Sequence, residues 1–235
     1  MSRLEGAIDP VGDPDRIPLV IVEDEDLYRD LLRIALSQQP NIEVVGVFGD
    51  GESALAAAAE LRPRVAVLDI ELPGGLNGVQ LGLRLRRLMP ELGIVLLSNH
   101  GDPEFVASLP ADVLSGWSYL QKKSVSDVAV LQRAVSGATN GMVMLDPNLV
   151  TGMRPRAGGL LERLTPRQQE ILAFIAQGYT NRAIAARLHL AEKSVENQIN
   201  ALYQQLEIDR NEPDIHLRVR AVLIYLQESR MRGPA

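Results

Sequence analysis

Short, uninterrupted apolar runs recur along the first 136 residues of this chain and constrain its fold more than any other feature of the sequence. The runs are Leu19–Val22, Val44–Phe48, Val65–Leu68, Ile94–Leu97 and a weaker Tyr119–Leu120. Such runs are typical of strands buried on both faces of a parallel sheet. Amphipathic stretches that predict helices follow them: Asp26–Leu36, Gly51–Leu61, Val79–Met89, Pro103–Leu109 and Val125–Val135. Five repeats predict a five-stranded, doubly wound α/β domain with its site at the carboxyl ends of the strands.

From Leu160 onward the pattern is purely helical. Thr165, Pro166 and Gln168 form a strong helix start, with a threonine cap, proline at the first helical position and glutamine three residues after the cap. Gly178 ends this helix and Thr180 caps the next one. The later helices are therefore expected at about 180–188, 192–206 and 215–227, with a three-residue turn before the second of these. This spacing predicts a small all-α helix-turn-helix domain.

The composition along the chain predicts four segments. We expect a polar, disordered arm over residues 1–16 and the α/β domain over 17–137. A Gly- and Pro-rich linker is expected over 138–159, with one packed turn around Met142–Leu149. The helix-turn-helix domain then covers 160–235.

The charge is distributed unevenly between the two halves of the chain. Residues 1–150 carry 12 Lys and Arg against 21 Asp and Glu, whereas residues 151–235 carry 12 against 9. This asymmetry favours an acidic regulatory half and a mildly basic binding half. The absence of cysteine excludes disulfides and thiolate metal sites. No apolar stretch approaches the roughly 18 residues of a membrane span, so we expect a soluble, cytoplasmic protein with no membrane partner.

Three carboxylates are expected to converge at the end of the sheet. Glu23 and Asp24 directly follow the first predicted strand, and Asp69 directly follows the third. Two unit charges about 4 Å apart repel by about 4 kcal/mol at an effective dielectric constant of about 20, so three such groups need a cation. Hard oxygen ligands favour Mg²⁺. A carboxylate neutralised in this way can act as a nucleophile toward a phosphoryl donor.

Two more polar groups follow neighbouring strands and complete this site. Ser98 ends the fourth strand and supplies a hydroxyl, and Lys122 lies just past the fifth and supplies a charge for phosphoryl oxygens. Residues 17–137 with these features closely resemble the receiver domain of two-component response regulators, which has a flavodoxin-like fold. The resemblance implies that Asp69 in VLDIELP is the phosphoacceptor. It also implies that Lys122 in YLQKK is the site lysine and that Ser98 and Tyr119 form the switch.

The receiver resemblance has departures and leaves alternatives. The loop ELPGGLNG after Asp69 is longer than usual, Ser118 stands where Gly is more common, and Lys123 where Asp is common. Lys123 is the alternative site lysine, and Tyr119 is alternatively a core aromatic. One rival function is an aspartyl-phosphate hydrolase of the haloacid-dehalogenase type, although that class has its nucleophile on the first strand. Another is a regulator or protein-interaction module that does not depend on phosphorylation.

The segment Leu164–Leu206 resembles the LuxR-type helix-turn-helix of NarL/FixJ response regulators. The matching residues are Leu164, Thr165, Pro166, Arg167, Gly178, Asn181, Ile184, Ala185, Leu188, Val195 and Leu206. Most of them have a structural role, and an apolar stripe is expected to form the core: Ile171, Leu172, Ile175, Ile184, Leu188, Val195, Ile199 and Leu202. The resemblance implies a transcription factor that binds promoter DNA and is phosphorylated by a sensor histidine kinase.

By position in this family, the third helix of the domain would enter the major groove. Glu196, Asn197 and Asn200 would face base edges, and phosphate contacts would come from Arg182, Arg187, Lys193 and Ser194. Several departures weaken this match: Glu196 stands where a basic residue is common and Gln198 where His is common, Ala191 replaces the usual Ser cap, and Ala183 breaks a second capping box after Thr180. We therefore expect modest affinity that depends on dimerisation, and protein binding by this helix is the alternative.

The last predicted helix carries more apolar residues than a four-helix core can bury. Its simplest role is to close the core. The family resemblance adds a homodimer contact through Ala221, Ile224 and Tyr225.

Overall fold

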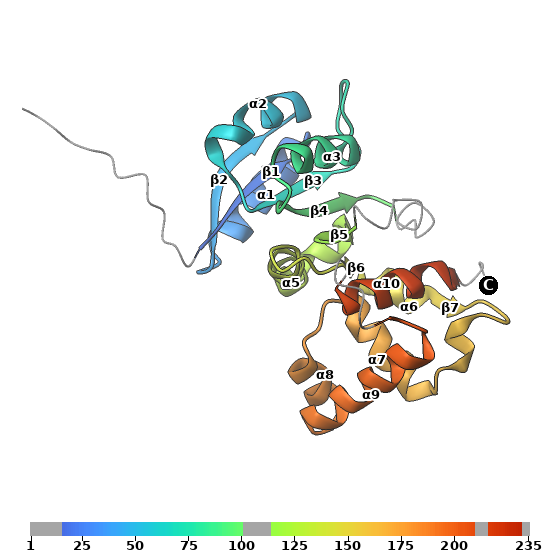
Figure 1. The fold of residues 1–235 in the computed structure, drawn as a ribbon. Helices are drawn as coiled ribbons and strands as arrows, with labels where there is room; N and C mark the ends of the chain where they lie inside the picture. The colour runs from blue at the N-terminus through green and yellow to red at the C-terminus, as the bar shows by residue number, and fades with distance from the viewer. Residues whose placement is uncertain (1–15, 101–113, 210–215, 232–235) are drawn as a thin grey trace, which may run out of the picture.

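The computed structural model describes residues 16–100, 114–209 and 216–231. The helix predicted at Pro103–Leu109 and nearly all of the predicted N-terminal arm lie outside the described residues. Figure 1 shows an α/β part, coloured blue to green, and a helical part, coloured yellow to red, with strand β6 between them.

Six parallel strands form the main sheet, in the order β2-β1-β3-β4-β5-β6. Their bounds are β1 Ile17–Val22, β2 Ile42–Phe48, β3 Val65–Asp69, β4 Gly93–Ser98, β5 Trp117–Gln121 and β6 Met144–Leu145. All residues of β3, β4 and β5 are buried, as the uninterrupted apolar runs predict. The doubly wound α/β fold is therefore confirmed, with one strand more than expected.

Helices cover both faces of this sheet. Helices α1 (Asp26–Ser37) and α5 (Val128–Ala138) pack on one face through one apolar cluster. Helices α2 (Gly51–Leu61) and α3 (Gly78–Leu88) pack on the other. The start of α5 differs from the prediction because residues Lys122–Ser126 form a short 3-10 helix first.

The segment expected to be a linker is largely built into the fold. Met144 and Leu145 form the sixth strand, and α6 (Pro147–Gly152) and β7 (Met153–Pro155) follow. Asp146 is fully buried between them, where its side chain caps α6 and accepts a hydrogen bond from the Gln121 amide at 2.9 Å. Strand β6 and helix α6 are too short for their apolar residues to show a recognisable period in the sequence.

The helical part contains four helices within the described residues. They are α7 Pro166–Ala176, α8 Asn181–Leu188, α9 Glu192–Gln205 and α10 Leu217–Gln227, preceded by a 3-10 turn at Leu160–Arg163. The capping box of Thr165 and Gln168 is present, and Ala191 provides no side-chain cap for α9. Every residue of the predicted apolar stripe is buried.

A short antiparallel pair closes the helical part. Strand β8 (Ser229–Met231) follows α10 and pairs with β7, so that the two ends of this part meet. The Arg156 amide donates to the Glu228 carbonyl at 2.8 Å and extends the pairing.

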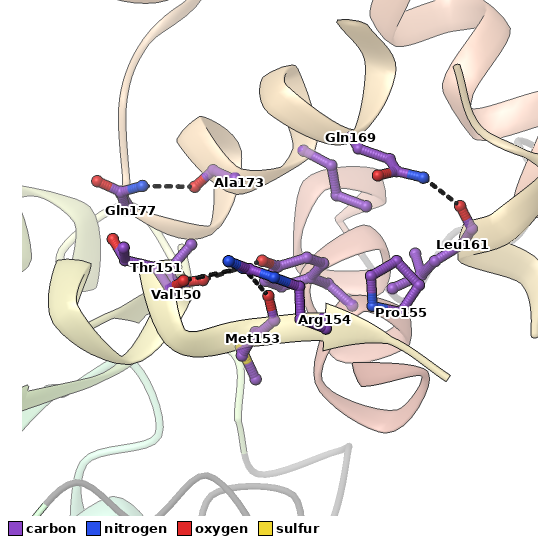
Figure 2. Close-up of a pocket in the computed structure, with 11 residues that line it drawn as sticks. Val150, Thr151, Met153, Arg154, Pro155, Leu161, Gln169, Ala173 and Gln177 are labelled. Atoms are coloured by element: carbon purple, nitrogen blue, oxygen red, sulfur yellow. Dashed lines mark hydrogen bonds between the residues drawn. The ribbon is translucent and has the colours of Figure 1, made fainter. Parts of the chain in front are cut away.

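One apolar cluster runs from the sheet into the helical part. It contains Leu96 and Tyr119 of the sheet, Leu145 and Leu149 of the connecting segment, and Ile171 of α7. The connecting segment does not pack completely against α7 and α10. A cavity of about 350 Å³ remains between them. Figure 2 shows Arg154 in this cavity, where its guanidinium donates to the carbonyls of Thr151 and Met153.

Candidate functional site

Three carboxylates lie together at the carboxyl ends of β1 and β3, as their positions in the sequence predict. Glu23, Asp24 and Asp69 each offer an oxygen within 4.8 Å of the others. Glu23 and Asp69 are buried, whereas Asp24 is exposed. Glu23 Oε2 is buried and has no hydrogen-bond partner among the described residues. The cluster therefore has both concentrated negative charge and an unused buried ligand atom.

Lys122 bridges two of these carboxylates. Its Nζ lies 2.8 Å from Glu23 Oε1 and 2.9 Å from Asp69 Oδ2, and only 10% of its side chain is exposed. Tyr28 of α1 donates a hydrogen bond to the Lys122 carbonyl at 3.1 Å, and the Lys122 Nζ lies 5.0 Å from the centre of its ring. Lys123 is exposed. The geometry therefore favours Lys122 over Lys123 as the site lysine.

The electrostatics of this cluster reflect burial and opposing charges. Burial is the largest influence on Glu23 and, with the Asp69 charge, raises its pKa to about 7 although Lys122 acts in the other direction. Burial alone would lower the pKa of Lys122, but its hydrogen bonds and ion pairs with Glu23 and Asp69 raise it. Without a second cation, one lysine therefore does not fully compensate the buried carboxylates.

The other two residues predicted for this site lie on neighbouring strands. Ser98 ends β4, is buried, and its Oγ accepts a hydrogen bond from the His100 amide at 3.1 Å. Tyr119 lies on β5 with its ring in the core, and its hydroxyl donates to the His100 carbonyl at 2.5 Å. Both side chains therefore hold the same residue of the loop after β4.

Gly78 lies against the backbone of Asp69 and constrains the loop between them. The sequence analysis did not identify this residue. A Cβ at position 78 would lie 2.0 Å from the Asp69 carbonyl oxygen, so only glycine allows this approach. Asn77 then caps α3 in a capping box with Gln80. The longer loop noted in the sequence is therefore anchored at both ends beside Asp69.

The helical part presents a polar face on α8 and α9. Side chains of the predicted nucleic-acid contacts Arg182, Arg187, Lys193, Ser194, Asn197 and Asn200 are exposed, and Glu196 is partly exposed. Lys193 Nζ pairs with Glu196 Oε2 at 2.9 Å. In Figure 1, α9 lies far from the sheet, so the α/β part does not cover α9.

Two family profiles match this chain. The response regulator receiver domain matches residues 19–136, and the luxR family of bacterial regulatory proteins matches residues 162–214. This chain belongs to the response regulators with a LuxR-type helix-turn-helix domain. The receiver and helix-turn-helix predictions are thus confirmed.

Curated relatives of this response regulator align over nearly its whole length. The DNA-binding transcriptional activator DevR/DosR of Mycobacterium tuberculosis is 31% identical over 224 residues, which cover 93% of this chain and 98% of that protein. The response regulator protein VraR of Staphylococcus aureus is 32% identical over 205 residues, which cover 85% and 95%. The solved structure of the Salmonella typhimurium RcsB response regulator is 22% identical, with a TM-score of 0.44, and covers 91% of this chain and 98% of its own.

The three residues predicted for a dimer contact differ in exposure. Ala221 and Tyr225 are buried, and the Tyr225 hydroxyl donates to the Val150 carbonyl at 3.4 Å. Only Ile224 is partly exposed. The connecting segment contributes to the burial of Tyr225 through Val150. No helix in the parts of the chain that the structure describes is long and apolar enough to cross a membrane.

Proposed function

We propose that phosphorylation of Asp69 in this response regulator controls the binding of promoter DNA by α8 and α9. The observation that carries the proposal is the environment of Asp69: a buried carboxylate bonded to Lys122 and within 4.8 Å of the oxygens of Glu23 and Asp24. Phosphoryl transfer needs such a nucleophile together with compensating positive charge.

In the proposed reaction, a carboxylate oxygen of Asp69 attacks the phosphorus of a donor. The donor is a phosphohistidine of a sensor kinase or a small acyl phosphate, and its bond to phosphorus breaks as the new P–O bond forms. Lys122 Nζ, which lies 2.9 Å from Asp69 Oδ2, is positioned to bind a phosphoryl oxygen. The reaction and the slow hydrolysis of the aspartyl phosphate are the only catalysis that we assign to the chain.

The residues at this site fit Mg²⁺. The unpartnered Glu23 Oε2 and the carboxylates of Asp24 and Asp69 supply the hard oxygen ligands that this ion prefers. When bound, Mg²⁺ would neutralise the carboxylates and the phosphoryl oxygens. Glu23 and Asp24 would hold the ion, and Asp69 would contribute one oxygen to it.

The switch proposed for the receiver uses Ser98 and Tyr119. The Ser98 hydroxyl would turn from the His100 amide toward a phosphoryl oxygen, and the Tyr119 hydroxyl would lose its bond to the His100 carbonyl. Because both contacts are to His100, their loss would change the position of this residue beside the site.

For DNA binding, we propose that Glu196, Asn197 and Asn200 meet base edges while Arg182, Arg187, Lys193 and Ser194 contact phosphates. A homodimer would place two copies of α9 on successive half-sites. Ile224 is available for a dimer contact, whereas Ala221 and Tyr225 are buried in this arrangement.

The proposal is tested by DNA binding before and after incubation with acetyl phosphate and Mg²⁺. Duplexes selected from a random library serve as the probe, and fluorescence anisotropy measures the affinity. We expect tighter binding after phosphorylation and a linear fall of log K with log salt concentration, because phosphate contacts release counterions. A flat salt dependence would contradict the DNA proposal and favour a protein partner for α9.

The Lys193–Glu196 ion pair leads to a second prediction. A Glu196→Gln variant is expected to bind DNA about threefold more tightly, with a salt slope steeper by about 0.9, because Lys193 is released and a negative charge near the phosphates is removed. Glu170→Gln makes the same change in an ion pair on α7 and serves as the control. Weaker binding by Glu196→Gln would instead indicate that this carboxylate accepts a hydrogen bond from a base.

A further inference from the structure

The cavity between the connecting segment and helices α7 and α10 has no part in the function proposed above. Its volume of about 350 Å³ lies in the range of small-molecule sites in proteins. Apolar side chains form about half of its wall: Val150, Met153, Pro155, Leu161, Leu172 and Ala173. The other lining residues carry polar groups, and Arg154 is the charged residue among them. An apolar chamber with a few polar groups is the usual composition of a site for an organic ligand.

Arg154 brings a positive charge to this cavity, and no carboxylate of the described residues compensates it. The cavity lining contains neither Asp nor Glu, and none of the ion pairs between described residues includes Arg154. Its Nη1 donates to the carbonyls of Thr151 at 3.0 Å and Met153 at 2.8 Å, as Figure 2 shows. These bonds hold the guanidinium in place and leave its Nε and Nη2 without a partner among the described residues. Two adjacent N–H donors of this kind match the two oxygens of a carboxylate.

The charge of Arg154 acts on the buried wall of the cavity. Burial raises the pKa of Tyr225 to about 12, and the charge of Arg154 acts in the opposite direction. Tyr225 lines the cavity from α10, and its hydroxyl donates to the Val150 carbonyl at 3.4 Å. Arg154 itself is exposed, so an anion can reach it from solvent. An ion pair that extends into a partly buried chamber is screened less than one at the surface.

Two glutamines determine where a negative charge fits in the cavity. Gln169 Nε2 donates to the Leu161 carbonyl at 3.0 Å, and Gln177 Nε2 donates to the Ala173 carbonyl at 3.2 Å (Figure 2). These bonds occupy the amide nitrogens, so each glutamine has its carbonyl oxygen left as an acceptor. An acceptor oxygen repels an anion, whereas a guanidinium attracts it. The anionic group of a ligand is therefore expected at Arg154 and not beside the glutamines.

We propose that this cavity binds a small organic carboxylate with an apolar body. The carboxylate pairs with Nε and Nη2 of Arg154, and the apolar body lies against Leu161 and Leu172. A water molecule takes up about 30 Å³ in the liquid, so the cavity of about 350 Å³ holds roughly ten to twelve groups of this size. A medium-chain fatty acid such as octanoate fits this volume. The site goes beyond the function proposed above, because neither the phosphoryl group nor DNA takes part in it.

Isothermal titration calorimetry of the full chain with octanoate tests this proposal. We expect saturable binding at one site of the wild-type chain and about tenfold weaker binding by Arg154→Gln, because a charge-assisted pair is lost. Arg154 is exposed, so its replacement leaves the core intact. Arg87→Gln makes the same change at an exposed position on α3 and is expected to bind octanoate like the wild-type chain. Octylamine, which has a similar tail and a positive charge, is expected not to bind.

Three results of this titration would overturn the proposal. They are no saturable binding of octanoate by the wild-type chain, equal affinities of Arg154→Gln and Arg87→Gln, and equal binding of octanoate and octylamine. The titration needs neither a phosphoryl donor nor DNA. Its outcome is therefore independent of whether Asp69 controls DNA binding.

A second variant locates the bound octanoate. Ala173→Leu fills part of the cavity from α7 with a good helix former and leaves Arg154 unchanged, so octanoate is expected to bind at least about tenfold more weakly. Octanoate is also expected to slow amide hydrogen exchange at residues 150–155 and 171–177 of the wild-type chain but not of Ala173→Leu. Undiminished binding by Ala173→Leu, or slower exchange only in other segments, would place octanoate outside the cavity and overturn the proposal.

Discussion

Incubation with acetyl phosphate and Mg²⁺ is expected to add one phosphoryl group to the wild-type chain and none to an Asp69→Asn variant. The asparagine amide keeps the shape of the side chain but lacks the nucleophilic oxygen pair, so the loss should be complete. Intact mass spectrometry measures the adduct directly. EDTA should also prevent it, because Glu23, Asp24 and Asp69 would then repel the incoming phosphoryl oxygens without a cation.

Glu71→Gln is the matched control for this experiment. Glu71 lies two residues after Asp69, in the loop that follows β3, and its amide donates a hydrogen bond to Asp69 Oδ1 at 3.1 Å. Its side chain should not be needed, so the adduct should persist. A phosphoryl adduct on the Asp69→Asn variant would show that a residue other than Asp69 is the phosphoacceptor. No adduct on the wild-type chain would contradict the proposed switch and favour a regulator that does not depend on phosphorylation.

Replacement of Lys122 by methionine is expected to destabilise the metal-free receiver by about 3 kcal/mol, because it leaves two buried carboxylates without their ion-pair partner. Urea unfolding in EDTA measures this change. Lys123→Met removes the same charge from the exposed neighbouring residue and should change the free energy of unfolding by less than about 0.5 kcal/mol. Equal effects of the two substitutions would contradict the ion-pair role of Lys122.

The pH dependence of this experiment follows from Glu23. Its pKa in the folded chain is about 7, above the ordinary value of 4.5. The protonated form is therefore favoured by folding, and the stability that it contributes is present below pH 4.5 and is lost as the pH rises through 7. Without Lys122 the two carboxylates repel more strongly when ionised. The destabilisation by Lys122→Met should thus be larger at about pH 8 than at about pH 5, and Mg²⁺ should reduce it.

The receiver core and its acidic site could be predicted because the signals are local. Each central strand is a continuous apolar run, and each carboxylate follows directly after one of them. Parallel-sheet topology then brings Glu23 and Asp69 together without further information. The same holds for the helix-turn-helix core, where cap residues such as Thr165 and the apolar period determine both the ends of the helices and their buried faces.

Apart from the packed turn expected around Met142–Leu149, the structure of the connecting segment could not be predicted, because it depends on distant residues. Strand β6 has two residues and gains its order from pairing with β5, and Asp146 is positioned by the Gln121 amide. The contact between the Arg133 guanidinium and the Tyr179 ring joins residues far apart in the sequence, so no local pattern indicates it. The contact of Tyr225 with Val150 of this segment has the same origin.

The pairing of β7 with β8 has a mechanical consequence. Residues 156–228 begin and end at this pair, so the chain of the DNA-binding unit forms a loop tied shut at its base. Within the described residues, β6 and α6 lead from the receiver to this tie. A displacement of β6 would therefore reach the DNA-binding unit at its closed base, close to both ends of that unit's chain.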